Sequence, residues 1–399
     1  MSTHFSLIYL LSQGIIFNGE GWSMKNIFKI LILISIVFFI GSCSDPIFYT
    51  VFLETPILKP FINGSPTNFA EFNNSLYVAS GKKIFKYNGT WSEWIKYNDR
   101  IVALAATNSS LYALYLQNDT SNGRILNLTS GAPLNLLNVQ SIHAVNDILF
   151  ASVRTSAGNA NTDTYKIYYK DGVADFTEIS LVIPEGKTSS WLVGVASNSI
   201  NYYLCTIYGI YSVDKTTFAA SLILTPSVNN DEFTGIISLD NDYIAVISKS
   251  GRLYEIDSAN NFRTVISSEF NNNRSSTGAL AVWYKENTDL NPSLLLVGRK
   301  ENSYTTSSGY TNGYVEITLD TATGEIIGSQ FNEPGLNSLS SIDNNNSYVS
   351  SLGKQPVNHI IQTPKNVDPN MRLFASTQQE GVWSYRDRGE GLRWNAEQP

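Results

Sequence analysis

Gly81-Lys-Lys-Ile-Phe-Lys-Tyr87 is the first of six short segments in which a glycine opens the same predicted β-strand. The other five are Gly123-Arg-Ile-Leu-Asn-Leu128, Gly209-Ile-Tyr-Ser-Val213, Gly251-Arg-Leu-Tyr-Glu-Ile256, Gly313-Tyr-Val-Glu-Ile317 and Gly381-Val-Trp-Ser-Tyr385. The first three intervals between these glycines are 42, 86 and 42 residues, and a copy without glycine, Tyr165-Lys-Ile-Tyr-Tyr169, lies inside the longest. A period slightly above forty residues with several strands per unit is typical of a β-propeller.

The glycine that opens each copy has a physical role. It lies where the chain turns from the second strand of a unit into the third. A tight reversal of this kind favours positive φ, which glycine adopts without steric cost. We therefore expect positive φ at this position in every unit that carries the glycine.

The number of repeats follows from applying this period along residues 66–399 and counting the units. Each unit reads as four strands joined by polar turns. The 130 residues from Gly251 to Gly381 contain one further clear copy, so either two units carry insertions or an additional unit is degraded. The sequence predicts an all-β propeller of seven four-stranded blades with a long loop at 333–358. Eight blades, one of them degraded, remain the alternative.

The N-terminal region carries an export signal. Lys25 and Lys29 lie before and at the start of an apolar run, 30–40, that is followed by Gly41, Ser42 and Cys43. A basic start, a short apolar stretch and small residues at the cleavage point describe a secretory signal. The run is too short to span a bilayer, which needs roughly 20 apolar residues. We predict four segments: 1–23, a start-site extension or spacer; 24–42, the signal peptide; 43–65, an anchor linker and lead-in strand; and 66–399, the propeller.

The segment Ile40-Gly41-Ser42-Cys43 resembles the lipobox of bacterial lipoproteins. This resemblance implies that Cys43 carries the lipid, palmitate among its acyl groups, and becomes the new N-terminus. It also implies an envelope location, anchored to a membrane through the lipid alone, with the outer membrane favoured over the inner. Acylation of Cys43 would leave Cys205 as the only other cysteine, and its strand context predicts a small buried residue.

Charge restricts the classes of partner. The net charge is −7, and removal of residues 1–42 would delete two lysines and one glutamate, bringing it to −8. This acidic balance argues against a nucleic-acid partner. The expected partners are therefore an envelope or host protein, or a glycan, and the expected state is a monomer.

The stretch from Leu373 to Tyr385, Leu-Phe-Ala-Ser-Thr-Gln-Gln-Glu-Gly-Val-Trp-Ser-Tyr, resembles the repeat of WD40-like and quinoprotein-like bacterial propellers. The likeness extends over roughly residues 66–397 and implies the fold. With its lipobox-like segment, the chain as a whole resembles lipid-anchored bacterial propeller lipoproteins. The chain has no Trp-Asp repeat ending, no Gly-Gly pair of the kelch type and no Ser-x-Asp-x-Gly-x-x-Trp box of sialidases.

Candidate chemistry is sparse. After residue 42 the only histidines are His143 and His359, both near the start of predicted inner strands, where they could approach one another in a central channel. They are candidates for a proton donor or metal ligand, or else for backbone-bonded residues of the wall. The segment 343–347 only partly matches a calcium loop. We predict no cofactor, no metal and no catalytic set.

Aligning the starts of the predicted inner strands gives a ring of residues at one mouth of the channel. Its members are Asn68, Arg100, Ser141, Trp191, Thr277 and Asn358. Aromatic and arginine side chains at a concave mouth favour binding of a partner. We predict Arg100, Trp191 and His359 as ligand-binding residues. The lengthened loops around 285–312 and 333–358 are further candidates.

These observations favour a binding module without catalysis, presented on a lipid anchor. Two alternatives stay open. One is an enzyme, a lyase or glycosidase working in the channel, for which a ring of acids or a bound metal would be expected. The other is a scaffold for protein assembly in the outer envelope, for which an exposed apolar groove would be expected.

Overall fold

The structure is a computed structural model. It describes residues 60–397 except 120–121, 156–162, 229, 268–269, 271–273, 285–292, 302–312, 321, 333–351, 353–355 and 388–391. The chain divides into two compact units, Met1–Leu58 and Lys59–Pro399, and all described residues belong to the second. Cys43 and the segments predicted over 1–42 therefore lie outside the described residues.

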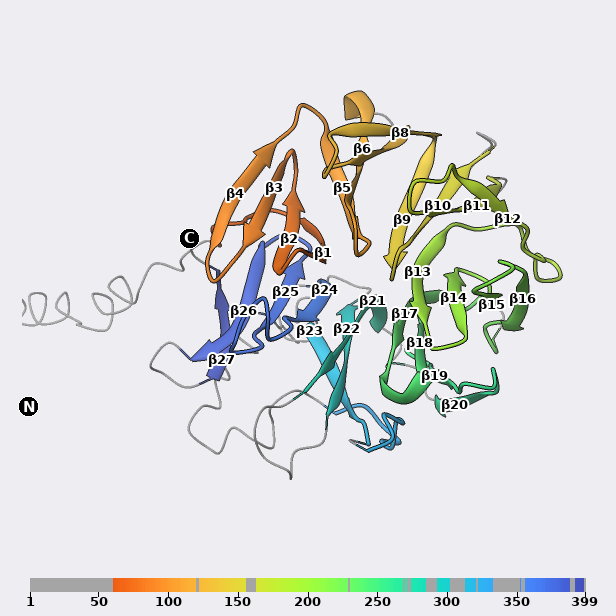
Figure 1. Ribbon diagram of the computed structural model, residues 1–399. Coiled ribbons are helices and arrows are strands. Elements are labelled where there is room, and N and C mark those ends of the chain that lie inside the picture. Colours follow the sequence, from red (N-terminus) through yellow and green to blue (C-terminus); the bar gives the residue numbers. More distant parts are fainter. Residues whose placement is uncertain are drawn as a thin grey trace, which may run out of the picture. The chain divides into compact units, whose positions relative to one another are not determined.

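Residues 66–397 form seven antiparallel sheets, each built from strands consecutive in sequence, so the predicted seven-bladed β-propeller is confirmed (Figure 1). Blade 1 contains β1 (Pro66–Phe72), β2 (Ser75–Ser80), β3 (Lys83–Tyr87) and β4 (Trp91–Lys96). Blade 2 contains β5 (Arg100–Ala106), β6 (Leu111–Leu116), β7 (Gly123–Asn127) and β8 (Ala132–Leu137). Blade 3 contains β9 (Val139–Val145), β10 (Ile148–Arg154), β11 (Tyr165–Asp171) and β12 (Thr177–Ile179).

The second half of the ring repeats this pattern. Blade 4 contains β13 (Leu192–Ser197), β14 (Asn201–Thr206), β15 (Ile210–Asp214) and β16 (Ala220–Leu224). Blade 5 contains β17 (Phe233–Ser238), β18 (Ile244–Ser248), β19 (Leu253–Ile256) and β20 (Phe262–Ile266). Blade 6 contains β21 (Arg274–Trp283), β22 (Leu294–Glu301) and β23 (Gly313–Thr318). Blade 7 contains β24 (Val357–Gln362), β25 (Leu373–Thr377), β26 (Val382–Asp387) and β27 (Leu392–Ala396).

Blade 6 differs from the four-stranded prediction, because its sheet has three strands within the described residues. After β23, Ile326 makes an isolated bridge with Leu319 in place of a fourth strand. Blade 5 holds this part of the chain: Ile326 N donates to the buried Glu255 carboxylate at 2.6 Å, and Arg263 donates to the Ile326 carbonyl at 2.8 Å. A salt bridge from Arg263 to Glu255 fixes both partners.

The apolar core lies between the blades. The described residues form seven buried hydrophobic clusters, and each cluster draws on two neighbouring blades around the ring. The second strand of a blade lies between the two neighbouring blades, so β14 and β18 are buried along their whole length. The fourth strands β4 and β8 are largely exposed. Stability therefore comes from contacts between blades, which leaves the inner strands free to line a central space.

The ring closes where blade 7 meets the chain that leads into blade 1. Phe61 N donates to the Glu397 carbonyl at 2.7 Å, and Val382 N donates to the Ile62 carbonyl at 3.0 Å. Behind this backbone contact, Tyr87 of β3 donates its hydroxyl to Asp368 at 2.9 Å and accepts from Arg372 at 2.9 Å. The lead-in segment thus seals the last blade against the first.

The glycine that opens the third strand has two different roles. At Gly81 and Gly381 φ is +61° and +78°, as predicted. Gly123 and Gly209 differ, because neither has a positive φ. At Gly123 the constraint is space, since a Cβ there would lie 1.9 Å from the Val139 carbonyl oxygen. At Gly381 both constraints apply, since a Cβ would lie 2.0 Å from the Ile62 carbonyl oxygen in the closing contact.

Two smaller predictions can be compared with the described residues. Cys205 is a buried free cysteine in the cluster between blades 4 and 5, as expected, and burial raises the pKa of its thiol. Within residues 60–397, none of the described helices has the length and apolar character needed to cross a membrane.

Candidate functional site

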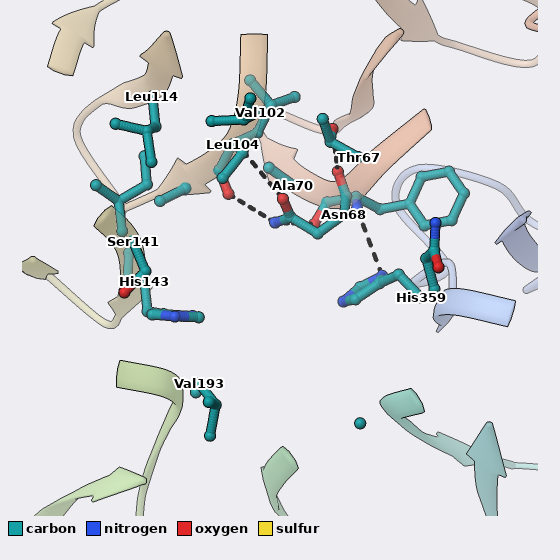
Figure 2. Close-up of a pocket in the computed structure, with 18 of the residues that line it drawn as sticks. Thr67, Asn68, Ala70, Val102, Leu104, Leu114, Ser141, His143, Val193 and His359 are labelled. Atoms are coloured by element: carbon teal, nitrogen blue, oxygen red, sulfur yellow. Dashed lines mark hydrogen bonds between the residues drawn. The ribbon is translucent and has the colours of Figure 1, made fainter. Parts of the chain in front are cut away.

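The described inner strands enclose a central channel with a volume of about 980 Å³. All seven inner strands contribute to its wall: β1, β5, β9, β13, β17, β21 and β24. Blades 1, 2 and 3 supply the longest stretches, 65–71, 100–106 and 139–144. Figure 2 shows side chains from these strands facing the channel, together with His359 on β24.

Each inner strand shifts its pairing register once, near its start. Opposite the second strand, the inner strand carries at least one extra residue at this point. The inserted residues that line the channel are Thr67 and Asn68, Val102, Gln140, Val193, Thr234, Thr277 and Gly278, and Asn358. A bulge bends its strand and redirects side chains, so these residues form one level of the channel wall.

Asn68 joins two inner strands that do not pair as a sheet. Its Nδ2 donates to the Leu104 carbonyl at 2.6 Å, and its Oδ1 accepts from Leu104 N at 3.0 Å (Figure 2). The side-chain amide therefore takes the place of a peptide group from a neighbouring strand and ties blade 1 to blade 2. Both hydrogen-bonding ends of Asn68 are used within the wall.

Ser141 and His143 perform the same function between blades 3 and 4. Ser141 Oγ donates to the Leu192 carbonyl at 2.8 Å, and His143 Nε2 lies 3.3 Å from the same oxygen. A carbonyl oxygen can only accept, so Nε2 of His143 carries the hydrogen. In the neutral ring, Nδ1 then holds a free lone pair.

His359 joins blade 7 to blade 1. Its Nδ1 accepts a hydrogen bond from Phe69 N at 3.4 Å, and its ring packs against Phe69 with centroids 5.7 Å apart. A backbone N–H can only donate, so Nδ1 holds the lone pair and Nε2 carries the hydrogen in the neutral ring. The two histidines thus expose opposite hydrogen-bonding groups beyond their wall contacts.

Both imidazoles are neutral at pH 7. Burial lowers the pKa of His143 to about 4, although its bond to the Leu192 carbonyl acts in the opposite direction. Burial also lowers the pKa of His359 to about 4, and charge repulsion from His143 adds to this effect. The sequence-based hypothesis that the two histidines approach one another is therefore supported, and both have the backbone partners expected of wall residues.

Several polar side chains of the channel have no partner among the described residues. Arg100, Gln140 and Asn358 are exposed to solvent, and no described group bonds to their side chains. Arg100 begins β5 and is the only arginine or lysine of the described lining. Glu71, near the end of β1, is the only acid there, and desolvation raises the pKa of its carboxyl.

The predicted ring of residues is placed as follows. Asn68, Arg100, Ser141, Thr277 and Asn358 line the channel, and so does His359. Trp191 lies outside this lining, immediately before β13, where it packs edge-on against Tyr165 with centroids 5.3 Å apart. Alignment by strand starts missed Gln140, which is the extra residue at the bulge of β9, and Glu71, which lies near the far end of β1.

Two other predicted features remain outside this geometry. The lengthened loops 285–312 and 333–358 fall largely outside the described residues. Within the described part of the chain, no group of three or more His, Cys, Asp or Glu side chains is arranged to hold a metal ion. Asp343 of the partial calcium loop also lies outside the described residues.

Comparison with known proteins gives a fold and no family. No protein-family model matches the chain. No curated protein matches it either.

Solved structures show similar propellers. The chain is similar to the extracellular domain of a hybrid two-component system from B. thetaiotaomicron, with a TM-score of 0.51 and 13% identity over 82% of this chain and 40% of that one. It is similar to virginiamycin B lyase from Staphylococcus aureus, with a TM-score of 0.53 and 9% identity over 82% of this chain and 96% of that one. A chain of a mitotic checkpoint complex gives a TM-score of 0.52 and 11% identity over 86% and 92%.

These similarities define the class of protein, a seven-bladed β-propeller. The chain spans 40% of the length of the two-component system's extracellular domain. The names of these three proteins describe different functions at 9–13% identity to this chain, so the similarity establishes the fold alone. The function has to be argued from the channel.

The lowered pKa values predict how stability depends on pH. Between about pH 6.5 and 4 the unfolded chain binds protons at His143 and His359 and the folded chain does not, so the free energy of unfolding falls as pH falls through this window. Each imidazole contributes on the order of 1–2 kcal/mol after solvent screening. Urea denaturation of residues 44–399 measures the loss. We expect a flatter profile in the His143→Gln, His359→Asn double variant, and an identical slope would contradict the assignment.

Proposed function

We propose that this protein is a lipid-anchored propeller of the bacterial envelope that binds a protein or glycan through its central channel and does not transform it. The anchor rests on the sequence around Cys43. The binding function rests on the channel, a cavity of about 980 Å³ in which the side chains of Arg100, Gln140 and Asn358 have no described bonding partner. Binding sites are typically concave with a few convergent polar groups, and the channel has this character.

The chemistry of the channel supports binding over catalysis. An efficient general base has a pKa near the working pH, whereas both imidazoles have a pKa of about 4 and use one nitrogen each to hold the wall. Glycoside cleavage generally requires two carboxylates, and Glu71 is the only acid of the described lining. A lyase or glycosidase therefore has less support than a binding module.

The scaffold alternative would require a continuous apolar surface. Among the described residues, the large exposed apolar side chains are spread around the ring: they include Trp94, Leu137 and Phe262 on the fourth strands of blades 1, 2 and 5, and Val182 and Ile183 between blades 3 and 4. Single exposed apolar side chains of this kind are ordinary in soluble domains. The partners that this channel fits best are polar, and the proposed assembly state is a monomer.

The anchor is tested by acylation. Cells given a labelled fatty acid should incorporate the label into the wild-type protein and not into Cys43→Ala, because the thiol is the proposed site of lipid attachment. The modified protein should partition with membranes, and Cys43→Ala should not. A mature N-terminus without an acyl group would contradict the anchor while leaving the propeller and its channel in place.

Binding through the channel is tested with residues 44–399 screened against envelope proteins and a glycan array. Replacing the exposed guanidinium in Arg100→Gln should weaken any binder found by about tenfold, as expected for loss of a charged hydrogen bond. Arg124→Gln on β7, outside the channel lining, is the matched control and should bind as the wild type does. Equal affinity in both variants, or turnover of a screened compound, would contradict the proposal.

A further inference from the structure

The two histidines of the channel present complementary groups. His143 uses Nε2–H on the Leu192 carbonyl, which leaves Nδ1 as an acceptor, whereas His359 uses Nδ1 on Phe69 N, which leaves Nε2–H as a donor. Figure 2 shows His143 on β9 and His359 on β24 extending into the channel from opposite sides. One wall therefore offers an acceptor and the opposite wall offers a donor.

We propose that the channel binds an extended, neutral stretch of polypeptide, one of whose trans amides lies between His143 and His359. The amide N–H donates to Nδ1 of His143 and the amide C=O accepts from Nε2–H of His359. The inference rests on the proposed binding function and names the chemistry of its partner.

The geometry of the amide supports this assignment. In a trans peptide group the N–H and the C=O point in opposite directions, so one group can meet an acceptor on one wall and a donor on the other. A charged ligand has less to gain at this level, because both rings are neutral at pH 7 and stay so down to about pH 4. The two charged side chains, Arg100 and Glu71, lie near opposite ends of their own inner strands.

The neighbouring lining extends the site along a chain. Asn358 immediately precedes His359, and Gln140 lies three residues before His143, both at strand bulges and both without a described side-chain partner. Each carboxamide can donate and accept, which matches further peptide groups of an extended segment. A sugar is a less suitable ligand, because the described lining offers no exposed aromatic ring on which it could stack. Phe69 is the only Phe, Tyr or Trp of this lining, and it is 4% exposed.

Two substitutions separate the channel function of each ring from its wall contact. His143→Gln keeps an amide that can donate to the Leu192 carbonyl, and its acceptor oxygen is displaced from the position of the ring Nδ1. His359→Asn keeps an oxygen that can accept from Phe69 N, and because Asn is shorter its amide donor does not reach the position of the ring Nε2–H. Both should retain the cooperative unfolding transition of the wild type, which shows that any loss of binding arises in the channel.

The test uses ¹⁵N-histidine-labelled residues 44–399 and a blocked glycine peptide, N-acetyl-glycyl-glycine N-methylamide. Long-range ¹⁵N–¹H spectra should show both rings as Nε2–H tautomers. Millimolar peptide should shift His143 Nδ1 and His359 Nε2 together, and each substitution should weaken its binding about fivefold, the usual effect of one neutral hydrogen bond. The ester analogue, which lacks the central N–H, should leave His143 unshifted.

Three results would overturn the inference. They are rings in other tautomers, a response to maltotriose and not to the peptide, or a peptide affinity in both variants that equals that of the wild type. These failures can be distinguished from failure of the proposed function. If an envelope partner still binds in an Arg100-dependent manner while the peptide shifts neither imidazole, only this inference fails. If nothing binds the channel in either experiment, the proposed function fails as well.

Discussion

The structure depends on how each of the seven inner strands, which forms the edge of its sheet, satisfies the peptide groups on its unpaired side. Each inner strand pairs with its second strand on one edge and faces the channel with the other, so its peptide groups on that side have no ladder. All seven inner strands contain a bulge, and several carry side chains that bond to the next blade. Asn68, Ser141 and the two histidines all bond to backbone groups of an adjacent inner strand.

This arrangement decides which polar groups are available to a ligand. Side chains that hold the wall, such as Asn68, use their hydrogen bonds there and contribute shape to the channel. Arg100, Gln140 and Asn358 do not, and each histidine retains one nitrogen for the channel. A polar lining therefore arises as a by-product of the fold, and only a minority of its groups can recognise a partner. Burial of the two rings against the wall lowers the pKa of each imidazole and keeps both neutral at pH 7.

The sequence predicted the architecture well because short turn and strand patterns within each unit reveal the repeat. Glycine at Gly81 and Gly381 marks a turn that needs positive φ, and from Gly81 to Gly251 the strands repeat at a nearly constant spacing. The site was only partly predictable. Each bulge adds at least one residue to its inner strand, two in β21, and the sequence does not show where it falls. Arg100 and Asn358 were therefore placed in the channel, while Gln140 was missed and Trp191 was assigned to the same ring. Which nitrogen of a histidine faces the channel depends on its backbone partner in another blade, and no local pattern carries that information.

The central claim is that side-chain bonds between blades, and not packing alone, hold the inner strands around an open channel. Hydrogen exchange at the Leu104 amide in an Asn68→Leu variant tests it most directly, because Leu is close in size and can neither donate nor accept. We predict faster exchange at Leu104 than in the wild type, by about fivefold or more. The Thr107 amide, which bonds to the Ser110 carbonyl within the same hairpin, should keep its protection. Unchanged exchange at Leu104 would show that packing alone holds the wall and would contradict the claim.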